Sequence, residues 1–158
     1  MLGTNLMRIG VLSDTHVHTM EELPPQTIKA FSDLDLIVHC GDFVGSAVLD
    51  GLRQLGEVKA VRGNVDSMKL KGLLPEKEQF VVGDKKIGVV HGWGGREGIE
   101  HRIREVFQDV DVILYGHSHE PKIQKIGDIL FFNPGPGRWS YGILTVGKDI
   151  KGEIVRIG

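Results

Sequence analysis

Short apolar runs alternate with polar, glycine-containing segments along most of the chain. Because the runs are short, rich in Val and Ile, and bounded by Gly or Asp, they predict β-strands. The predicted strands are Arg8–Leu12, Leu36–His39, Val58–Val61, Gln79–Val82, Lys86–Val90, Val112–Tyr115, Ile123–Ile126, Ile129–Phe132, Gly142–Val146 and Glu153–Ile157. Two of the polar segments, Gly83-Asp84 and Gly127-Asp128, have turn residues and predict hairpins.

Helical spacing of apolar residues appears mainly between the early strands. It predicts helices over Pro25–Ser32, Ser46–Leu55 and Arg96–Phe107. Alternating strands and helices, followed by a run of hairpins, predict an α/β domain whose sheets are partly parallel and partly antiparallel. Ligands of such sheets bind beyond the carboxyl ends of the strands, so chemistry is expected there.

Composition narrows the class of protein. The 158 residues are 41% hydrophobic and 25% charged, which is typical of a soluble globular domain. A net charge of −2 gives no electrostatic reason to expect nucleic acid or an anionic membrane as partner. Cys40 is the only cysteine, which excludes an internal disulfide and favours a cytoplasmic location. We expect residues 1–6 to form a disordered N-terminal extension and residues 7–158 to form a single domain.

Each of five predicted strands is followed at once by polar residues that can hold a metal ion. These candidate ligands are Asp14, His16, Asp42, Asn64, His91, His117 and His119. The pairs Asp14/His16 and His117/His119 have i,i+2 spacing, so in extended backbone both members of a pair point the same way. A single Asp or His at the end of a strand is usually a turn or cap residue. The prediction of a metal site therefore depends on the whole ordered set.

The ligand types indicate the chemistry. Carboxylate, imidazole and amide donors without a thiolate suit Mn, Fe, Zn, Ni or Co. Seven ligands are too many for one catalytic ion with an open position, but they suffice for two ions that share a carboxylate. Two divalent ions would retain positive charge, attract phosphate, polarise its oxygens and lower the pKa of a bridging water. The sequence therefore predicts hydrolysis of a phosphoester.

Six segments resemble a known family. "SDTH", "HCGDFVG", "RGNVD", "VVHGWG", "YGHSH" and "NPGPGR" are similar, in this order, to motifs of the calcineurin-like metallophosphoesterases. Within that superfamily the chain most resembles the small phosphodiesterase group labelled YfcE/MJ0936-like. The resemblance implies a four-layer αββα sandwich of two mixed β-sheets. It also implies two divalent ions, with Mn²⁺ preferred and Ni²⁺, Fe²⁺, Zn²⁺ or Mg²⁺ as alternatives.

The resemblance also assigns roles to the candidate residues. Asp42 would bridge the two ions, and Asp66 would orient its neighbours without binding metal. The ligands of the first ion would be Asp14, His16, Asp42 and His119. The second ion would have the catalytic group Asp42, Asn64, His91 and His117, with Asn64 near the substrate phosphate.

One position departs from the wider family. Larger members have a histidine after "GN" that is thought to protonate the leaving group, and this chain has Val65 there. Without that acid a poor alkoxide should leave slowly, whereas an activated aryl group should not need it. We therefore expect small aryl phosphodiesters to be better substrates than alkyl monoesters.

Several alternatives stay open at this point. His18 makes "DTHVHT" similar to the opening of PHP-type phosphoesterases, although the chain is short for their barrel. A non-catalytic scaffold like a retromer subunit shares the expected fold, but the intact ligand set favours an enzyme.

His39 is either a hydrogen-bonded core residue or a support for Asp42. The glycine-rich loop around Trp93 either offers N–H groups to a phosphate or is an ordinary loop. Small domains with exposed hairpin edges often pair, so a monomer and a homodimer both stay open.

Overall fold

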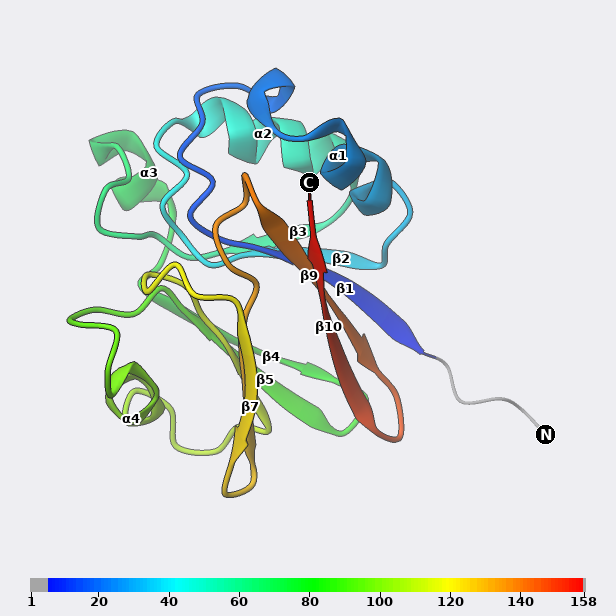
Figure 1. Cartoon of the computed structure of the whole chain (residues 1–158), viewed down its shortest axis with the longest axis vertical. Coiled ribbons are helices and arrows are strands. Elements are labelled where there is room, and N and C mark those ends of the chain that lie inside the picture. Colours follow the sequence, from blue (N-terminus) through cyan, green and yellow to red (C-terminus); the bar gives the residue numbers. More distant parts are fainter. Residues whose placement is uncertain (1–5, 158) are drawn as a thin grey trace.

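Two mixed sheets of five strands each pack face to face in the computed structural model, which describes residues 6–157 (Figure 1). The first sheet has the order β10-β9-β1-β2-β3, with bounds β1 Met7–Leu12, β2 Leu36–His39, β3 Val58–Ala60, β9 Ser140–Val146 and β10 Ile150–Arg156. The second has the order β4-β5-β6-β8-β7, with bounds β4 Lys77–Val82, β5 Lys85–Val90, β6 Val112–Leu114, β7 Lys122–Ile126 and β8 Ile129–Asn133.

Each sheet has a parallel part and an antiparallel part, as the pattern predicts. β1, β2 and β3 are parallel neighbours in the first sheet, and β5, β6 and β8 are parallel in the second. The remaining strands pair antiparallel, and both predicted hairpins form, with Gly83 and Gly127 at positive φ. The parallel strands of each sheet consequently end at a common edge.

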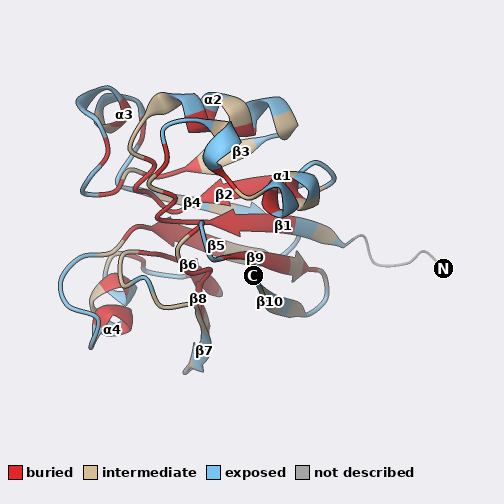
Figure 2. Cartoon of the chain, turned by 45° about the horizontal axis from the view of Figure 1, so that its top comes forward, coloured by how far each residue is buried: buried red, intermediate tan, exposed pale blue. Residues whose placement is uncertain are grey.

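Helices cover the outer face of each sheet, which makes four layers (Figure 2). α1 (Pro25–Phe31), α2 (Ser46–Leu55) and α3 (Met68–Leu73) pack on the first sheet, and α4 (Ile99–Arg104) packs on the second. A separate buried cluster fills the space between the sheets. β1 shows the underlying alternation, because Ile9 and Val11 enter the inter-sheet core while Leu12 faces the helices. The expected αββα sandwich is thus confirmed.

The local differences from the predicted elements have simple causes. All ten predicted strands form, but the helix expected over Arg96–Phe107 is confined to Ile99–Arg104. Gly98, its N-cap, has left-handed backbone with φ 77°, which ends the preceding loop. The sequence did not predict α3, because this helix has six residues with only Leu70 buried and so shows no periodicity. A short 3₁₀ turn, η1 (Met20–Glu22), was not predicted either.

Two further expectations concern the ends of the chain and membranes. Residues 1–5 of the expected extension lie outside the described residues, and Leu6 is exposed. Across residues 6–157, none of the helices has both the length and the apolar character that crossing a bilayer requires.

Candidate metal centre

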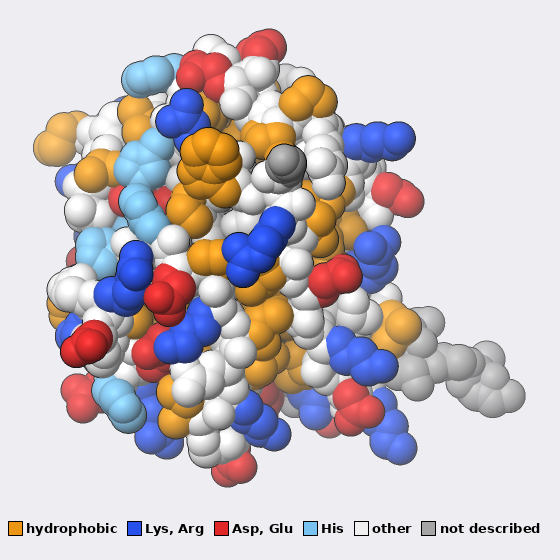
Figure 3. Space-filling view, in the orientation of Figure 1, with side chains coloured by type: hydrophobic (Ala, Val, Ile, Leu, Met, Phe, Trp, Pro, Cys, Tyr) orange, Lys and Arg blue, Asp and Glu red, His pale blue; other side chains and the backbone are white. Residues whose placement is uncertain are grey.

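The loops that follow β1, β2, β5 and β6 meet at one edge of the sandwich and bring aspartate and histidine side chains together. Figure 3 shows histidine side chains gathered at the left of the face that it presents. Donor atoms of Asp14, Asp42 and His91 lie within 4.8 Å of one another, as do those of Asp14, His16 and His119. Asp14 belongs to both groups. The structure therefore brings five of the seven predicted ligands into one cluster.

Asp14 has one oxygen anchored and the other directed at histidines. Its Oδ2 accepts hydrogen bonds from the Ser13 hydroxyl (2.6 Å) and the backbone N–H of His117 (3.1 Å). Its Oδ1 is buried, has no hydrogen-bond partner among the described residues, and lies 3.3 Å from His119 Nε2 and 3.8 Å from His91 Nε2. The neighbours of Oδ2 thus determine the direction in which Oδ1 points.

Asp42 is held in the same manner. Its Oδ1 accepts the backbone N–H of Val65 (2.9 Å), while its Oδ2 lies 3.2 Å from His91 Nε2 and 3.8 Å from His16 Nε2. Asp42 therefore faces a histidine of each group, as a bridging ligand must. Burial acts to raise the pKa of this carboxyl. The close approach and charge of the His91 imidazole, the Val65 N–H and the charge of His16 outweigh burial and keep the pKa below its usual value.

His91 is oriented by a backbone carbonyl. Its Nδ1 donates to the carbonyl oxygen of Cys40 (2.8 Å), which leaves Nε2 as the nitrogen that faces the carboxylates. Burial acts to lower the pKa of His91, but the close approach of the Asp42 carboxylate and the charges of Asp14 and Asp42 raise it above its usual value. The same negative potential that retains a proton here would attract a metal cation.

The cluster passes a test of fit for a metal ion. Asp14 Oδ1, His16 Nε2 and His91 Nε2 are buried atoms without hydrogen-bond partners in the described part of the chain. An unpaired buried polar atom costs about 1–3 kcal/mol, so three of them in one place require a reason. A divalent cation would satisfy all three, and mixed nitrogen and oxygen donors suit such an ion.

The backbone of the candidate ligands corrects one prediction. The i,i+2 pairs are not extended, because Asp14, His16, His117 and His119 have φ between 50° and 70°, as does Asp42. Left-handed backbone costs a residue with a side chain about 1–3 kcal/mol, and such strain gathers at functional sites. The prediction of extended backbone was wrong: left-handed backbone at both positions brings Asp14 and His16 into one group, whereas only His119 of the second pair joins it.

Glycines let the loops approach the aspartates closely. A Cβ atom on Gly63 would lie 2.1 Å from Asp42 Oδ1, and one on Gly116 would lie 1.9 Å from Ser13 Oγ and 2.6 Å from Asp14 Oδ2. The backbone at both glycines therefore lies directly against the candidate ligands or their neighbours, where no side chain would fit.

Asp66 ties two of these loops together. Its buried carboxylate accepts four backbone N–H groups, those of Asp42 (3.0 Å), Phe43 (2.6 Å), Val44 (3.0 Å) and Gly63 (2.7 Å). These contacts fix the loop after β2 against the loop after β3. The geometry is that of a residue that orients its neighbours, in line with the role the resemblance implies.

The other candidates lie at the margin of the cluster. His117 Nε2 donates to the carbonyl of Gly94 (3.0 Å), so its Nδ1 is the nitrogen left for a metal, and its ring centroid lies 5.2 Å from that of His91. Asn64 is exposed and lines a groove together with His91. His18 is exposed and contributes to neither His/Asp group.

His39 combines the two alternatives that the sequence left open. It is fully buried and stacks on Phe43 with ring centroids 3.5 Å apart. Its Nδ1 accepts the N–H of Gly41 (3.0 Å), so the neutral ring donates from Nε2 to Thr15 Oγ1 (3.1 Å). It is a core histidine that also supports two loops, the loop after β1 through Thr15 and the loop of Asp42 through Gly41. Ser13 and Thr15, within the quoted "SDTH", are functional neighbours that the sequence reasoning missed.

The pH dependence of folding should reveal His39. Burial and, secondarily, the charge of His91 lower the pKa of His39 to about 3. Because the unfolded chain binds this proton near pH 6.5 and the folded chain does not, stability falls as pH decreases from 6.5 toward 3. The slope from this residue is about 1.4 kcal/mol per pH unit. Urea unfolding of metal-free wild type and His39→Gln should show their difference in stability shrinking with acidity. For His101→Gln, at an exposed position, the free energy of unfolding should change with pH as it does in wild type. The same pH dependence in His39→Gln as in wild type would contradict the expectation.

Two facing mixed sheets, with an Asp/His cluster where their parallel strands end, define a metal-dependent phosphoesterase domain. The chain belongs to the calcineurin-like phosphoesterase superfamily, whose domain matches residues 7–146. A probable metallophosphoesterase of Methanocaldococcus jannaschii is 42% identical over 133 residues, which cover 82% of this chain and 67% of that protein. A phosphodiesterase of the same organism, MJ0936, is 33% identical over 94% of this chain and 99% of its own length.

Solved structures agree with the fold. A structurally and functionally characterised archaeal phosphodiesterase superposes with a TM-score of 0.77, is 27% identical, and covers 96% of this chain and 100% of its own. Vps29 from Entamoeba histolytica, solved in complex with Zn²⁺, has a TM-score of 0.70 and 26% identity over 95% of this chain and 99% of its own. The family suggested by the six motifs is thus confirmed.

Proposed function

We propose that this protein is a dinuclear metal-dependent phosphodiesterase that hydrolyses small phosphodiesters. One observation carries the proposal: within residues 6–157, Asp14 Oδ1, His16 Nε2 and His91 Nε2 are buried without hydrogen-bond partners, and both histidine nitrogens lie within 4.0 Å of Asp14 Oδ1 and of Asp42 Oδ2. The named phosphodiesterase relatives support the substrate class.

The proposal assigns ligands as the resemblance implies. One ion would be held by Asp14, His16, Asp42 and His119, and the other by Asp42, Asn64, His91 and His117. When bound, the ions supply positive charge that polarises phosphate oxygens and makes water more acidic. The chain's own contribution is to hold the donor atoms in place through Ser13, Cys40 and Val65. Mn²⁺ is our preferred ion, and metal analysis of the purified protein tests that choice.

The leaving group receives no help from residue 65. Val65 is exposed, and its side chain cannot donate a proton, while its backbone N–H is already engaged by Asp42. General acid catalysis contributes about 10²–10⁴-fold where it is available. Its absence at this position should matter for alkoxide leaving groups and much less for aryl groups.

With added Mn²⁺, bis(p-nitrophenyl) phosphate should be hydrolysed at least about tenfold faster than a sugar monophosphate. The reason is that p-nitrophenolate departs without protonation, whereas a sugar alkoxide does not. The measurement is kcat/KM for both substrates, with chelator-treated protein as the control. A clear preference for the sugar ester would overturn the assignment of substrate class.

The alternatives make different predictions. A PHP-type enzyme would need a barrel, and the two facing sheets exclude that fold. A non-catalytic scaffold of the same fold remains the competing function. Because the Vps29 structure was solved with Zn²⁺, metal binding alone does not separate enzyme from scaffold. Turnover does, since a scaffold would bind metal and release no nitrophenol.

We also propose a cytoplasmic location, as the sequence indicates, and a homodimer. Cys40 is a free, buried cysteine, and burial raises the pKa of its thiol, which keeps it protonated and unreactive. A single unpaired thiol suits a reducing compartment. Sedimentation of the purified protein would test the dimer.

A further inference from the structure

A groove of about 700 Å³ lies beside the metal centre and shares His91 and Asn64 with it. Its volume falls within the range of about 300–1,000 Å³ that is typical of small-molecule sites. The walls outside the metal centre come from the loop after β3, from α3, from β4 and the residue before it, from the end of β5 and the loop after it, and from the loop after α4. They include Arg62, Lys71, Glu76, Lys77, Trp93 and Val106.

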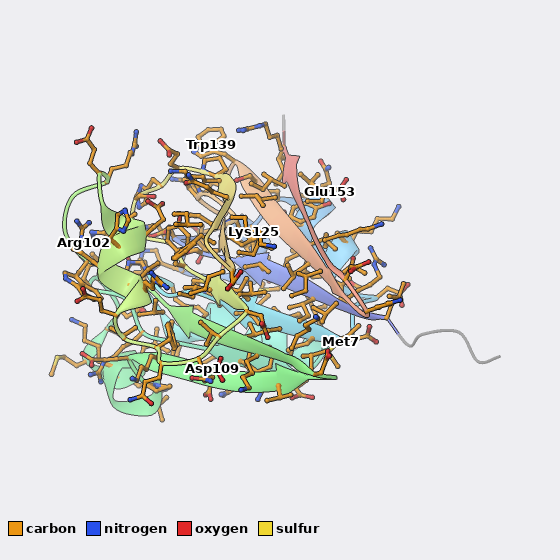
Figure 4. All side chains as sticks on the ribbon, turned by 90° about the horizontal axis from the view of Figure 1, so that it is seen from below. Met7, Arg102, Asp109, Lys125, Trp139 and Glu153 are labelled. Carbon is orange, nitrogen blue, oxygen red and sulfur yellow. The ribbon has the colours of Figure 1, made fainter. Side chains whose placement is uncertain are left out.

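Trp93 gives the groove an aromatic surface that is 46% exposed. Its loop is held firmly, because Arg102 of α4 donates from Nε to the Trp93 carbonyl (2.9 Å) and from its terminal nitrogens to the carbonyls of Gly95 and Glu97. Arg102 is labelled in Figure 4. On the other side, His117 donates to the Gly94 carbonyl. The indole is therefore presented to solvent by a fixed backbone.

The remaining lining of the groove combines apolar and basic side chains. Val90 and Val106 contribute apolar surface. Arg62 pairs with Glu76 (3.4 Å), and Lys77 donates to the Val106 carbonyl (2.8 Å), so both bases also brace the walls. With Lys71 they give the groove more positive than negative charge, which favours an anionic ligand.

We propose that this groove binds one ester arm of the substrate, and that Trp93 selects an aromatic or heteroaromatic arm. The inference rests on the proposed function and adds the substrate class: a phosphodiester in which one arm is a flat ring. The proposal places the ring against Trp93 and the phosphate at His91 and Asn64, which line the same groove together with the apolar side chains of Val90 and Val106. Aromatic pairing adds affinity beyond simple burial of apolar area, and an alkyl arm cannot gain it.

Phenylphosphonate and methylphosphonate test the groove without requiring turnover. They have the same anionic head, differ only in the ring, and have a P–C bond that hydrolysis of an ester does not cleave. On Mn²⁺-loaded protein, calorimetry should give phenylphosphonate about tenfold tighter binding than methylphosphonate. In Trp93→Ala, phenylphosphonate should bind about tenfold more weakly, with methylphosphonate unchanged within about twofold. Trp93→Phe should restore the preference for the ring.

The second tryptophan supplies a matched control and an optical readout. Trp139, labelled in Figure 4, is more exposed than Trp93 and is not among the groove's lining residues. Trp139→Phe should bind both probes as wild type does and leaves Trp93 as the sole tryptophan. Phenylphosphonate should then change the fluorescence of Trp93.

The outcomes separate this inference from the proposed function. Equal weakening of both probes in Trp93→Ala, or no preference for the ring in wild type, overturns the groove assignment even if diesters are hydrolysed. A preference for the ring that depends on Trp93 supports the groove assignment. It does so even if the protein hydrolyses no diester, a result that would contradict the proposed function alone.

Discussion

Replacing Asp42 with Asn should lower the turnover of bis(p-nitrophenyl) phosphate by more than about 100-fold. Losing even a residue that only orients a metal ligand typically costs about 10–100-fold, so loss of the proposed bridging carboxylate should cost more. The amide oxygen can still accept the Val65 N–H that Oδ1 now accepts. The amide nitrogen then faces His91 and His16 in place of Oδ2, and it cannot bind a cation.

The measurements for Asp42→Asn are turnover, metal content and thermal unfolding, all on protein prepared with excess Mn²⁺. One of the two proposed ions should be lost while the protein stays folded. Asp50→Asn is the matched control, because Asp50 is an exposed aspartate of α2 outside the cluster. Wild-type turnover in Asp42→Asn would remove the dinuclear mechanism. Unchanged metal content with lost turnover would instead move the bridge to Asp14, which belongs to both His/Asp groups.

Replacing Asp66 with Ala should lower the free energy of unfolding by about 4 kcal/mol. The carboxylate accepts four backbone N–H groups, three of them in fully buried bonds. Hydrogen bonds to a charged acceptor contribute about 1.5–3 kcal/mol each, and donors left unpaired carry a further cost. In Asp66→Ala, solvent can reach some of the N–H groups that lose the carboxylate. The expected loss of stability is therefore smaller than the sum of the four hydrogen-bond contributions.

Thermal and urea unfolding of the metal-free protein measure the effect of Asp66→Ala. The melting temperature should fall by about 10 °C for a domain of this size. Asp50→Ala should change stability by less than about 0.5 kcal/mol, as is usual for surface positions. If Asp66→Ala melted within a degree or two of wild type, Asp66 would not be what holds the loops after β2 and β3 together.

Much of the fold could be predicted from the sequence, because strands and tight turns depend largely on residues that are adjacent in the chain. The ten strands follow from short apolar runs, and the two hairpins follow from Gly83-Asp84 and Gly127-Asp128. The sequence did not predict α3, because this helix depends on the Ser67 cap and one buried leucine and has no repeating apolar pattern. The exposed start of the helix expected at Arg96 is likewise a loop whose path is set by contacts with Arg102.

For the site, the sequence by itself determined which kinds of donor atom are present, their order, and their positions after apolar strands. Only the tertiary structure decided how they meet. The carboxylate of Asp14 is oriented by the His117 N–H, 103 residues away in the chain, and the loop of Asp42 is fixed by Asp66, 24 residues away. Such contacts leave no local pattern. The contact of Asp14 with His117 depends on the two sheets packing face to face, and that of Asp42 with Asp66 depends on β2 pairing with β3 within one sheet. The left-handed backbone of the ligands and the Trp93 groove arise in the same way, from loops that close against one another once the sheets have packed.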